Sequence, residues 1–131
     1  MSGERDLARL LETLAPVRRP GRYVYACVDA MPDGIEPFAV VREDEGLTLV
    51  LDGDDADRLG LATSFDAALI TLRVHSALEA VGLTAAIARA LAAESISANV
   101  IAGFHHDHVL VPLDRADDAL ACLQSLSAEP R

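Results

Sequence analysis

The order in which the hydrophobic period changes between Phe65 and Leu126 limits the fold of this chain more than any other feature. Five segments follow one another there, each with the apolar spacing typical of one kind of element. They are a strand at 68–74, a helix at 83–95, strands at 99–102 and 109–113, and a helix from Asp114, with a polar turn at 104–108. This order predicts an α+β, ferredoxin-like fold in which helices cover one face of an antiparallel sheet.

Residues 1–60 carry weaker versions of the same patterns. Leucines at helical spacing predict a short helix that ends before Pro16. Strands are predicted at 23–28, 38–42 and 47–51, with a hairpin turn at 43–46 and a short helix at 54–59. We therefore predict two units, an N-terminal one at residues 1–62 and a C-terminal one at residues 63–131.

Composition fits a folded domain or two small fused ones. Of the 131 residues 51% are apolar, and no apolar run approaches the ~20 residues of a membrane-spanning helix. The charged start of the chain lacks the apolar core of a signal peptide, so the expected location is the cytoplasm. Cys27 and Cys122 are far apart in sequence, and we expect both to be buried, reduced thiols.

The charge balance excludes several classes of function. The chain has 11 basic residues, all arginine, against 21 acidic ones, which gives a formal net charge of −10. Such a surface repels polyanions, so nucleic acids and anionic membranes are not expected partners. The absence of lysine also excludes Schiff-base chemistry and a phosphate-binding P-loop lysine. A cationic ligand or partner remains compatible with this charge.

Gly82 marks the loop that matters most for function. It lies where a chain leaving a strand must enter a helix tightly, and without a Cβ it lets a ligand or another backbone approach closely. The amides that follow it would be the unpaired donors of a helix N-terminus, which suit a carboxylate or a phosphate. The sequence therefore predicts an anion-binding position at residues 82–84.

Three stretches of the second half resemble the ACT domain family. Residues 79–85 (Glu-Ala-Val-Gly-Leu-Thr-Ala) stand where that family usually has Asp-Arg-Pro-Gly-Leu-Leu-Ala, and residues 95–101 stand where it has its second strand. Residues 104–112, with 45–51 as a counterpart in the first half, resemble small bacterial ACT proteins and the ACT modules of cytosolic arginine sensors. The resemblance implies ferredoxin-like βαββαβ units in tandem, with an amino-acid site at their junction.

The resemblance also implies a role and a set of binding residues. The protein would be a regulatory amino-acid sensor without catalysis or cofactor, forming a homodimer or a fused pseudo-dimer. The ligand's carboxylate would rest on the amides of 82–84, and its amino group would meet carbonyls of 99–101 or the Asn99 side chain. The residues that we predict to bind ligand are His75, Ser76, Glu79, Val81, Gly82, Leu83, Thr84, Asn99, Val100, Ile101, Asp107, Thr48 and Leu49.

Two of these acids have equally simple structural interpretations. Asp107 stands where the arginine sensors have an acid at the ligand pocket, and a charge-assisted contact there is worth ~1.5–3 kcal/mol. It can also be a turn residue that caps its own backbone. Glu79 can hold an amino group, or it can be a solvated acid near a helix N-terminus.

An alternative function uses His105, His106 and His108, with Asp107 among them. Imidazole and carboxylate are ligands of zinc and iron, so these residues could form a metal site or an enzyme. Side chains alternate along an extended stretch, however, so His106 and His108 are expected on one side and His105 and Asp107 on the other. We therefore predict no metal site. A further alternative is an interaction module that binds no ligand.

Overall fold

A computed structural model describes residues 6–74 and 81–128 of the chain. The elements in chain order are α1 (Leu7–Glu12), β1 (Pro16–Arg18), β2 (Tyr23–Val28), β3 (Ala39–Glu43), β4 (Gly46–Asp52), α2 (Gly53–Arg58), β5 (Ser64–Leu72), α3 (Leu83–Ala93), β6 (Asn99–Ala102), β7 (Asp107–Pro112), a 3-10 turn (Leu113–Arg115) and α4 (Ala116–Ala128). The predicted β-α-β-β-α order of the second half is confirmed. The first half contains one strand more than predicted, β1.

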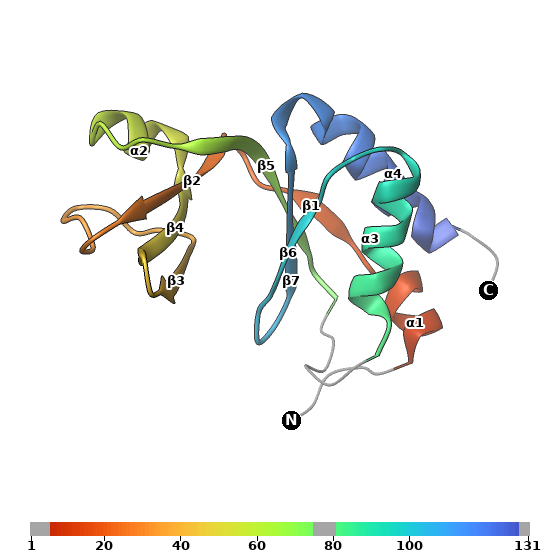
Figure 1. Ribbon diagram of the computed structural model, residues 1–131. Helices are drawn as coiled ribbons and strands as arrows, with labels where there is room; N and C mark the ends of the chain where they lie inside the picture. The colour runs from red at the N-terminus through yellow and green to blue at the C-terminus, as the bar shows by residue number, and fades with distance from the viewer. Residues whose placement is uncertain (1–5, 75–80, 129–131) are drawn as a thin grey trace.

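The strands form one antiparallel sheet with the order β3-β4-β2-β5-β7-β6, and β1 also pairs with β5. Figure 1 shows β5 running from the end that carries α2 to the end that carries α1, α3 and α4. Its first residues pair with β2 and its later residues pair with β7. The two halves of the chain are therefore joined through a strand that belongs to both.

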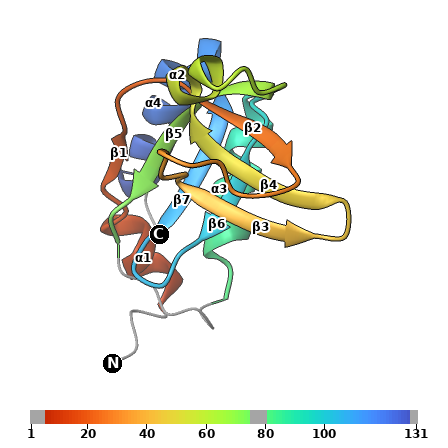
Figure 2. The same ribbon diagram turned by 90° about the vertical axis from the view of Figure 1, so that its left-hand side faces the viewer.

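A bulge at the start of β5 bends this sheet. Tyr23 faces Ala67 and Tyr25 faces Ser64, so a step of two residues on β2 is matched by three on β5. Phe65 within this step has a left-handed backbone with φ of +62°. An extra residue of this kind increases the local bend and twist of a strand. The sheet curls here, and Figure 2 shows β2, β3 and β4 in front of β5, β7 and β6.

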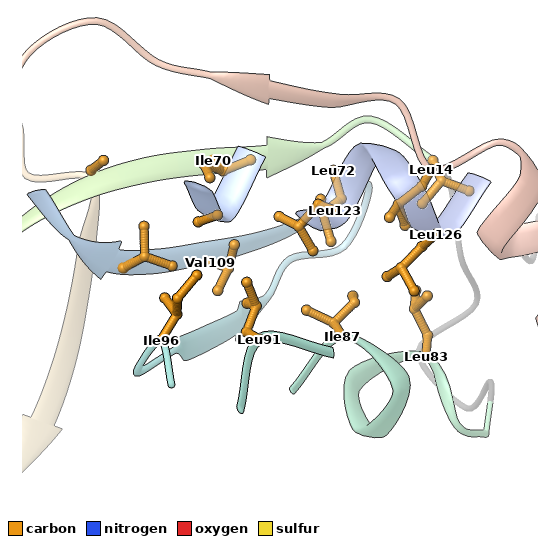
Figure 3. Packing of buried hydrophobic residues seen from close by; sticks show 14 of the residues in the cluster. Leu14, Ile70, Leu72, Leu83, Ile87, Leu91, Ile96, Val109, Leu123 and Leu126 are labelled. Carbon is orange, nitrogen blue, oxygen red and sulfur yellow. The ribbon is translucent and has the colours of Figure 1, made fainter. Parts of the chain in front are cut away.

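The curl gives the sheet an outer and an inner face. On the outer face of the C-terminal half, β5 and β7 pack against α1, α3 and α4 through Ile70, Leu72, Val109 and the leucines of the helices, as Figure 3 shows. On the outer face of the N-terminal half, Val24, Leu49 and Leu51 pack against α2. The helices therefore cover the outer face of both halves.

The inner face lies between the two halves and holds a cluster of its own. Its buried members are Val50, Ala67, Leu69 and Leu110, and tyrosine, phenylalanine and isoleucine side chains pack around them. Because side chains alternate along a strand, Ile70 and Leu72 of β5 lie on the outer face, and Ala67 and Leu69 lie on the inner face. Buried apolar surface on both faces accounts for the continuous hydrophobic run of this strand.

The packing of α1 departs from the predicted division of the chain. Leu10 and Leu14 are completely buried in the cluster that α3 and α4 form on the C-terminal half, and β1 pairs with the end of β5. The N-terminal segment thus crosses to the other half before β2 begins. The boundary at residues 62 and 63 stays a prediction, but it does not describe this packing.

Candidate functional site

The predicted anion-binding loop is partly closed by the chain itself. Gly82 caps α3 with φ of +99°, and a Cβ added to it would lie 3.2 Å from Cδ2 of Leu7. Leu83 is buried in the outer core, while Thr84 and Val81 are exposed, the latter to 83%. The space beside Gly82 is therefore bordered by the Leu7 side chain of α1. His75, Ser76 and Glu79 lie outside the described residues.

The three predicted residues of β6 face both ways. Asn99 is paired with Leu110 and Ile101 with His108, so these side chains belong to the inner face. Val100 packs with the outer core, on the side of α3. The sheet thus separates the side chains of Asn99 and Ile101 from the loop before α3. The structure does not bring these two parts of the predicted site together on one face.

The predicted residues of β4 are divided in the same way. Leu49 is fully buried under α2, so its side chain is part of the N-terminal core. Thr48 is on the inner face, where its hydroxyl donates to the carboxylate of Glu43. It lines an open hollow of about 400 Å³ whose other walls are Tyr25, Ala26, Cys27, Ala62, Thr63 and Ser64. Cys27 is exposed in this hollow, so the expectation that it is buried is wrong.

Asp107 and His108 point to opposite faces of β7. Asp107 is only 6% exposed and lies opposite Leu72, an outer-face residue, whereas His108 contacts inner-face residues. The alternation predicted for these two residues is confirmed. His106 Nδ1 is 3.5 Å from the Val74 carbonyl oxygen. Among the described residues no three histidine, cysteine or acidic side chains are placed to hold a metal ion.

A polar cluster on the inner face was not predicted. It consists of Arg19, Phe38, Thr71 and His108, and we call it the junction cluster. Arg19 Nε donates to Thr71 Oγ1 at 3.2 Å, and the same oxygen is 2.9 Å from His108 Nδ1. The Phe38 ring meets the His108 ring edge-on at 4.9 Å, and the Arg19 guanidinium carbon is 5.3 Å from the Phe38 centroid. Each member therefore contacts at least two others.

The surroundings of His108 favour its neutral form. Burial lowers the pKa of its imidazole, and the positive charges of Arg19 and His106 lower it further. In the tautomer that carries the proton on Nε2, the neutral His108 ring accepts at Nδ1 from the Thr71 hydroxyl, whose oxygen in turn accepts from Arg19 Nε. The cluster then presents two kinds of donor, the guanidinium of Arg19 and the Nε2 proton of His108.

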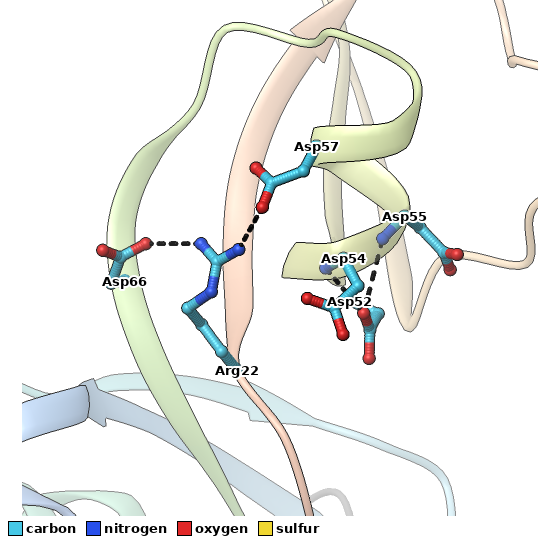
Figure 4. Close-up of polar contacts among 6 residues, drawn as sticks. All are labelled: Arg22, Asp52, Asp54, Asp55, Asp57 and Asp66. Atoms are coloured by element: carbon cyan, nitrogen blue, oxygen red, sulfur yellow. Dashed lines mark hydrogen bonds and ion pairs between the residues drawn. The ribbon is translucent and has the colours of Figure 1, made fainter.

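Acidic residues elsewhere in the N-terminal half have structural roles, as Figure 4 shows. Asp52 caps α2 by accepting from the amides of Asp54 and Asp55 at 2.8 and 3.4 Å. Arg22 lies between Asp57 and Asp66, with N to O distances of 2.7 and 3.0 Å. The acidic segment 52–57 thus starts a helix and ties it to β2 and β5.

Sequence reasoning missed three members of the junction cluster for one reason. Arg19 and Thr71 are 52 residues apart, and Thr71 and His108 are 37 apart. Spacing along the chain carries no signal for such contacts. The sequence offered two hints, a threonine (Thr71) within an apolar strand and an arginine (Arg19) beside Pro20. In the structure only 4% of Thr71 is exposed. Only the register of β1, β5 and β7 joins them.

Comparison with known proteins identifies the family to which this architecture corresponds. The ACT domain matches the chain twice, over residues 2–68 and over residues 64–125. No curated protein matches it. None of the helices within the described ranges has the length and apolar character needed to span a bilayer. The two matches overlap in β5 and confirm the tandem organisation and the fold predicted from the sequence.

Several solved structures superpose on nearly the whole chain. A protein of unknown function from Vibrio cholerae, described as a possible transport protein, is 47% identical with a TM-score of 0.83 over 92% of this chain and 95% of that chain. A protein from Agrobacterium tumefaciens is 20% identical, with a TM-score of 0.68 over 82% and 84%. The regulatory subunit of aspartate kinase from Thermus flavus is 9% identical, with a TM-score of 0.60 over 96% and 99%. The last two similarities are in fold alone.

Proposed function

This chain belongs to the ACT domain family, and from that premise we propose that it is a regulatory protein that binds an amino acid or a similar small zwitterion. Domains of this family are regulatory small-molecule-binding units, and both matches along the chain are to such domains. The proposal includes no catalytic residue and no cofactor. It includes a homodimer, because ACT domains commonly pair their sheets, and a location in the cytoplasm.

One observation carries the proposal, namely that the junction cluster takes side chains from both halves of the curled sheet. Phe38 precedes β3 in the N-terminal half, and its amide donates to the Val50 carbonyl at 2.7 Å. His108 belongs to β7 in the C-terminal half, yet the two rings are in contact. A ligand bound at this point touches both halves at once. Its occupancy therefore favours one relative placement of the halves over others, which is what regulation by binding requires.

A zwitterion needs a partner for each of its charges at such a site. An amide or charged group buried without a partner costs ~1–3 kcal/mol or more. Acceptors for the ammonium group lie nearby in β6. Among the described strands β6 pairs with β7 alone, and it carries the predicted residues Asn99 and Ile101 on or beside the inner face. We place the ligand on this inner face, between β6 and the start of β3.

A thermal-shift screen with the twenty amino acids tests the proposal. A ligand at about 100 times its Kd stabilises the native state by about 2.7 kcal/mol, so a true ligand is expected to raise Tm by several degrees. Calorimetric titration then gives its affinity. A complete panel without a shift in Tm and without binding heat would contradict the proposal.

Two phenylalanine variants locate the binding position. Phe38→Leu removes the ring that contacts His108 and is expected to weaken binding of any hit at least several-fold. Phe104→Leu changes a ring that is 68% exposed at the turn between β6 and β7 and is expected to leave affinity unchanged. Equal affinities for both variants would place the ligand elsewhere.

A further inference from the structure

Arg19 stands at the inner face without a carboxylate partner among the described residues, whereas its neighbour Arg18 has one. Arg18, Arg22, Arg58 and Arg115 each have a carboxylate oxygen within 3.6 Å. Arg19 has an acceptor only in the Thr71 hydroxyl, and in the described part of the chain no carboxylate lies within ion-pair distance of it.

Arg19 is an exposed residue whose side chain is oriented by two contacts. Its Nε bond to Thr71 and its position over the Phe38 ring fix the plane of the guanidinium. A guanidinium has five N–H donors in a rigid fork, and four of them remain after the bond from Nε. A fork that is fixed but lacks an acceptor suits a bidentate oxyanion.

His108 adds a second donor beside this fork. Its Nδ1 is bound to Thr71, and Nε2 has no hydrogen-bond partner among the described residues. Nε2 lies beside Gly103, where an added Cβ would be 3.4 Å from Nε2 and 2.7 Å from the His106 carbonyl oxygen. The positive charge of Arg19 helps to lower the pKa of His108. An anion between the two side chains would accept from the guanidinium and from the Nε2 proton.

We propose that Arg19 and His108 form a carboxylate-binding subsite, in which Thr71 positions both donors and Phe38 packs against the apolar part of the ligand. This inference deepens the proposed function and rests on it, because the subsite would hold the carboxylate of the amino acid. The class of ligand is a compound with a single carboxylate and a small apolar portion that can pack against Phe38, and it includes the amino acids of the proposed function. The net charge of −10 disfavours anions of higher charge, such as phosphate.

Sodium butyrate and butyramide test the subsite without knowledge of the natural ligand. The two compounds have the same apolar chain, but butyramide carries a neutral amide in place of the carboxylate. In NMR spectra of the histidine rings at constant ionic strength, butyrate is expected to shift one ring resonance in a saturable way, and butyramide is expected to leave it in place. The His108→Gln variant identifies that resonance by its loss. Arg19→Gln is expected to weaken butyrate binding at least tenfold.

The matched control is Arg18→Gln, one residue away. Arg18 is paired with Asp117 of α4, on the outer face, so this variant loses the same charge without touching the subsite. It is expected to bind butyrate within twofold of the unaltered protein. Equal weakening by both variants, or no saturable shift of the His108 ring, overturns the inference.

The outcomes also separate this inference from the proposed function. If butyrate binds as expected and no amino acid does, the subsite stands and amino-acid sensing is wrong. If an amino acid binds with the same affinity to the unaltered protein and to Arg19→Gln, sensing stands and the subsite is wrong. Competition between butyrate and a bound amino acid supports both.

Discussion

At the scale of residues, the charge state of His108 depends on its neighbours. The ring is half-buried, Arg19 and His106 are the positive groups that act on it, and Asp107 projects from the other face of β7. Burial comes first among the causes that lower its pKa. Because Thr71 connects His108 to Arg19, the titration of His108 reports on the position of Arg19.

We expect the His108 ring to titrate below its ordinary value of about 6.5. Arg19→Gln removes one of the positive charges and should raise that pKa, while burial should keep it below 6.5. NMR titration of the ring protons measures both values. Arg18→Gln serves as the control and should leave the titration unchanged. An identical midpoint in Arg19→Gln would contradict the contact between Arg19 and this site.

The same shift has a consequence for stability. Between the native pKa of His108 and about 6.5 the unfolded chain binds more protons at this residue than the native state does. The contribution of His108 to the free energy of unfolding is therefore complete above about 6.5 and is lost as the pH falls through the native pKa. Urea denaturation at several pH values measures this contribution. Over this range the free energy of unfolding should depend less on pH in His108→Gln than in the unaltered protein.

At the scale of elements, α2 depends on its cap. It has only six residues, and a helix of that length is not stable by propensity alone. Asp52 accepts from two of its first amides, and Arg22 connects its last turn to β5 through Asp57 and Asp66. A Cβ on Gly53 would lie 2.5 Å from the guanidinium carbon of Arg22, so this helix starts with a residue that leaves room for the arginine.

Asp52→Ala is expected to lower the free energy of unfolding by about 1 kcal/mol, because the cap is lost. Asp52→Asn keeps an oxygen that can accept from the same amides and is expected to retain most of the stability. Urea denaturation of the three proteins measures the difference. If alanine and asparagine destabilise equally, the charge of Asp52 matters and its role as a cap does not.

The elements of this chain could be predicted where their periodicity is strong. The run in β5 and the spacing of Leu83, Ile87 and Leu91 in α3 are clear because these residues are buried. Strand β1 was missed because it has three residues, two of them exposed, so it shows no alternation. The predicted site combined Gly82 with Asn99, and only the pairing of β6 with β7 reveals that their side chains belong to different faces. Register depends on contacts between distant segments, which no local pattern encodes.

At the scale of the whole molecule, the two halves share β5 and a common inner core. β2 occupies one side of the first residues of β5, β7 pairs with the rest, and Leu69 and Leu110 pack with residues of β2 and β4. Unfolding either half would expose the inner face of the other. We therefore expect the chain to unfold as one cooperative unit, although the ACT domain matches it twice.

The two tyrosines make this expectation testable. Tyr23 and Tyr25 are both in β2 and the chain has no tryptophan, so intrinsic fluorescence reports on β2 and on the inner-face cluster against which both rings pack. Circular dichroism at 222 nm reports mainly on α3 and α4, which are the longest helices described. In a urea titration the two signals are expected to give the same midpoint.

Two core variants sharpen the test, because each alters one half alone. Leu49→Ala opens a cavity under α2 and Leu91→Ala opens one under α3, and each is expected to cost ~2–5 kcal/mol since both side chains are fully buried. In a cooperative molecule each variant moves both signals together. If Leu49→Ala moves the fluorescence midpoint and leaves circular dichroism in place, the halves are independent. A ligand at the junction cluster could then stabilise one half without acting on the other, and the proposed regulation through their relative placement would lose its mechanical basis.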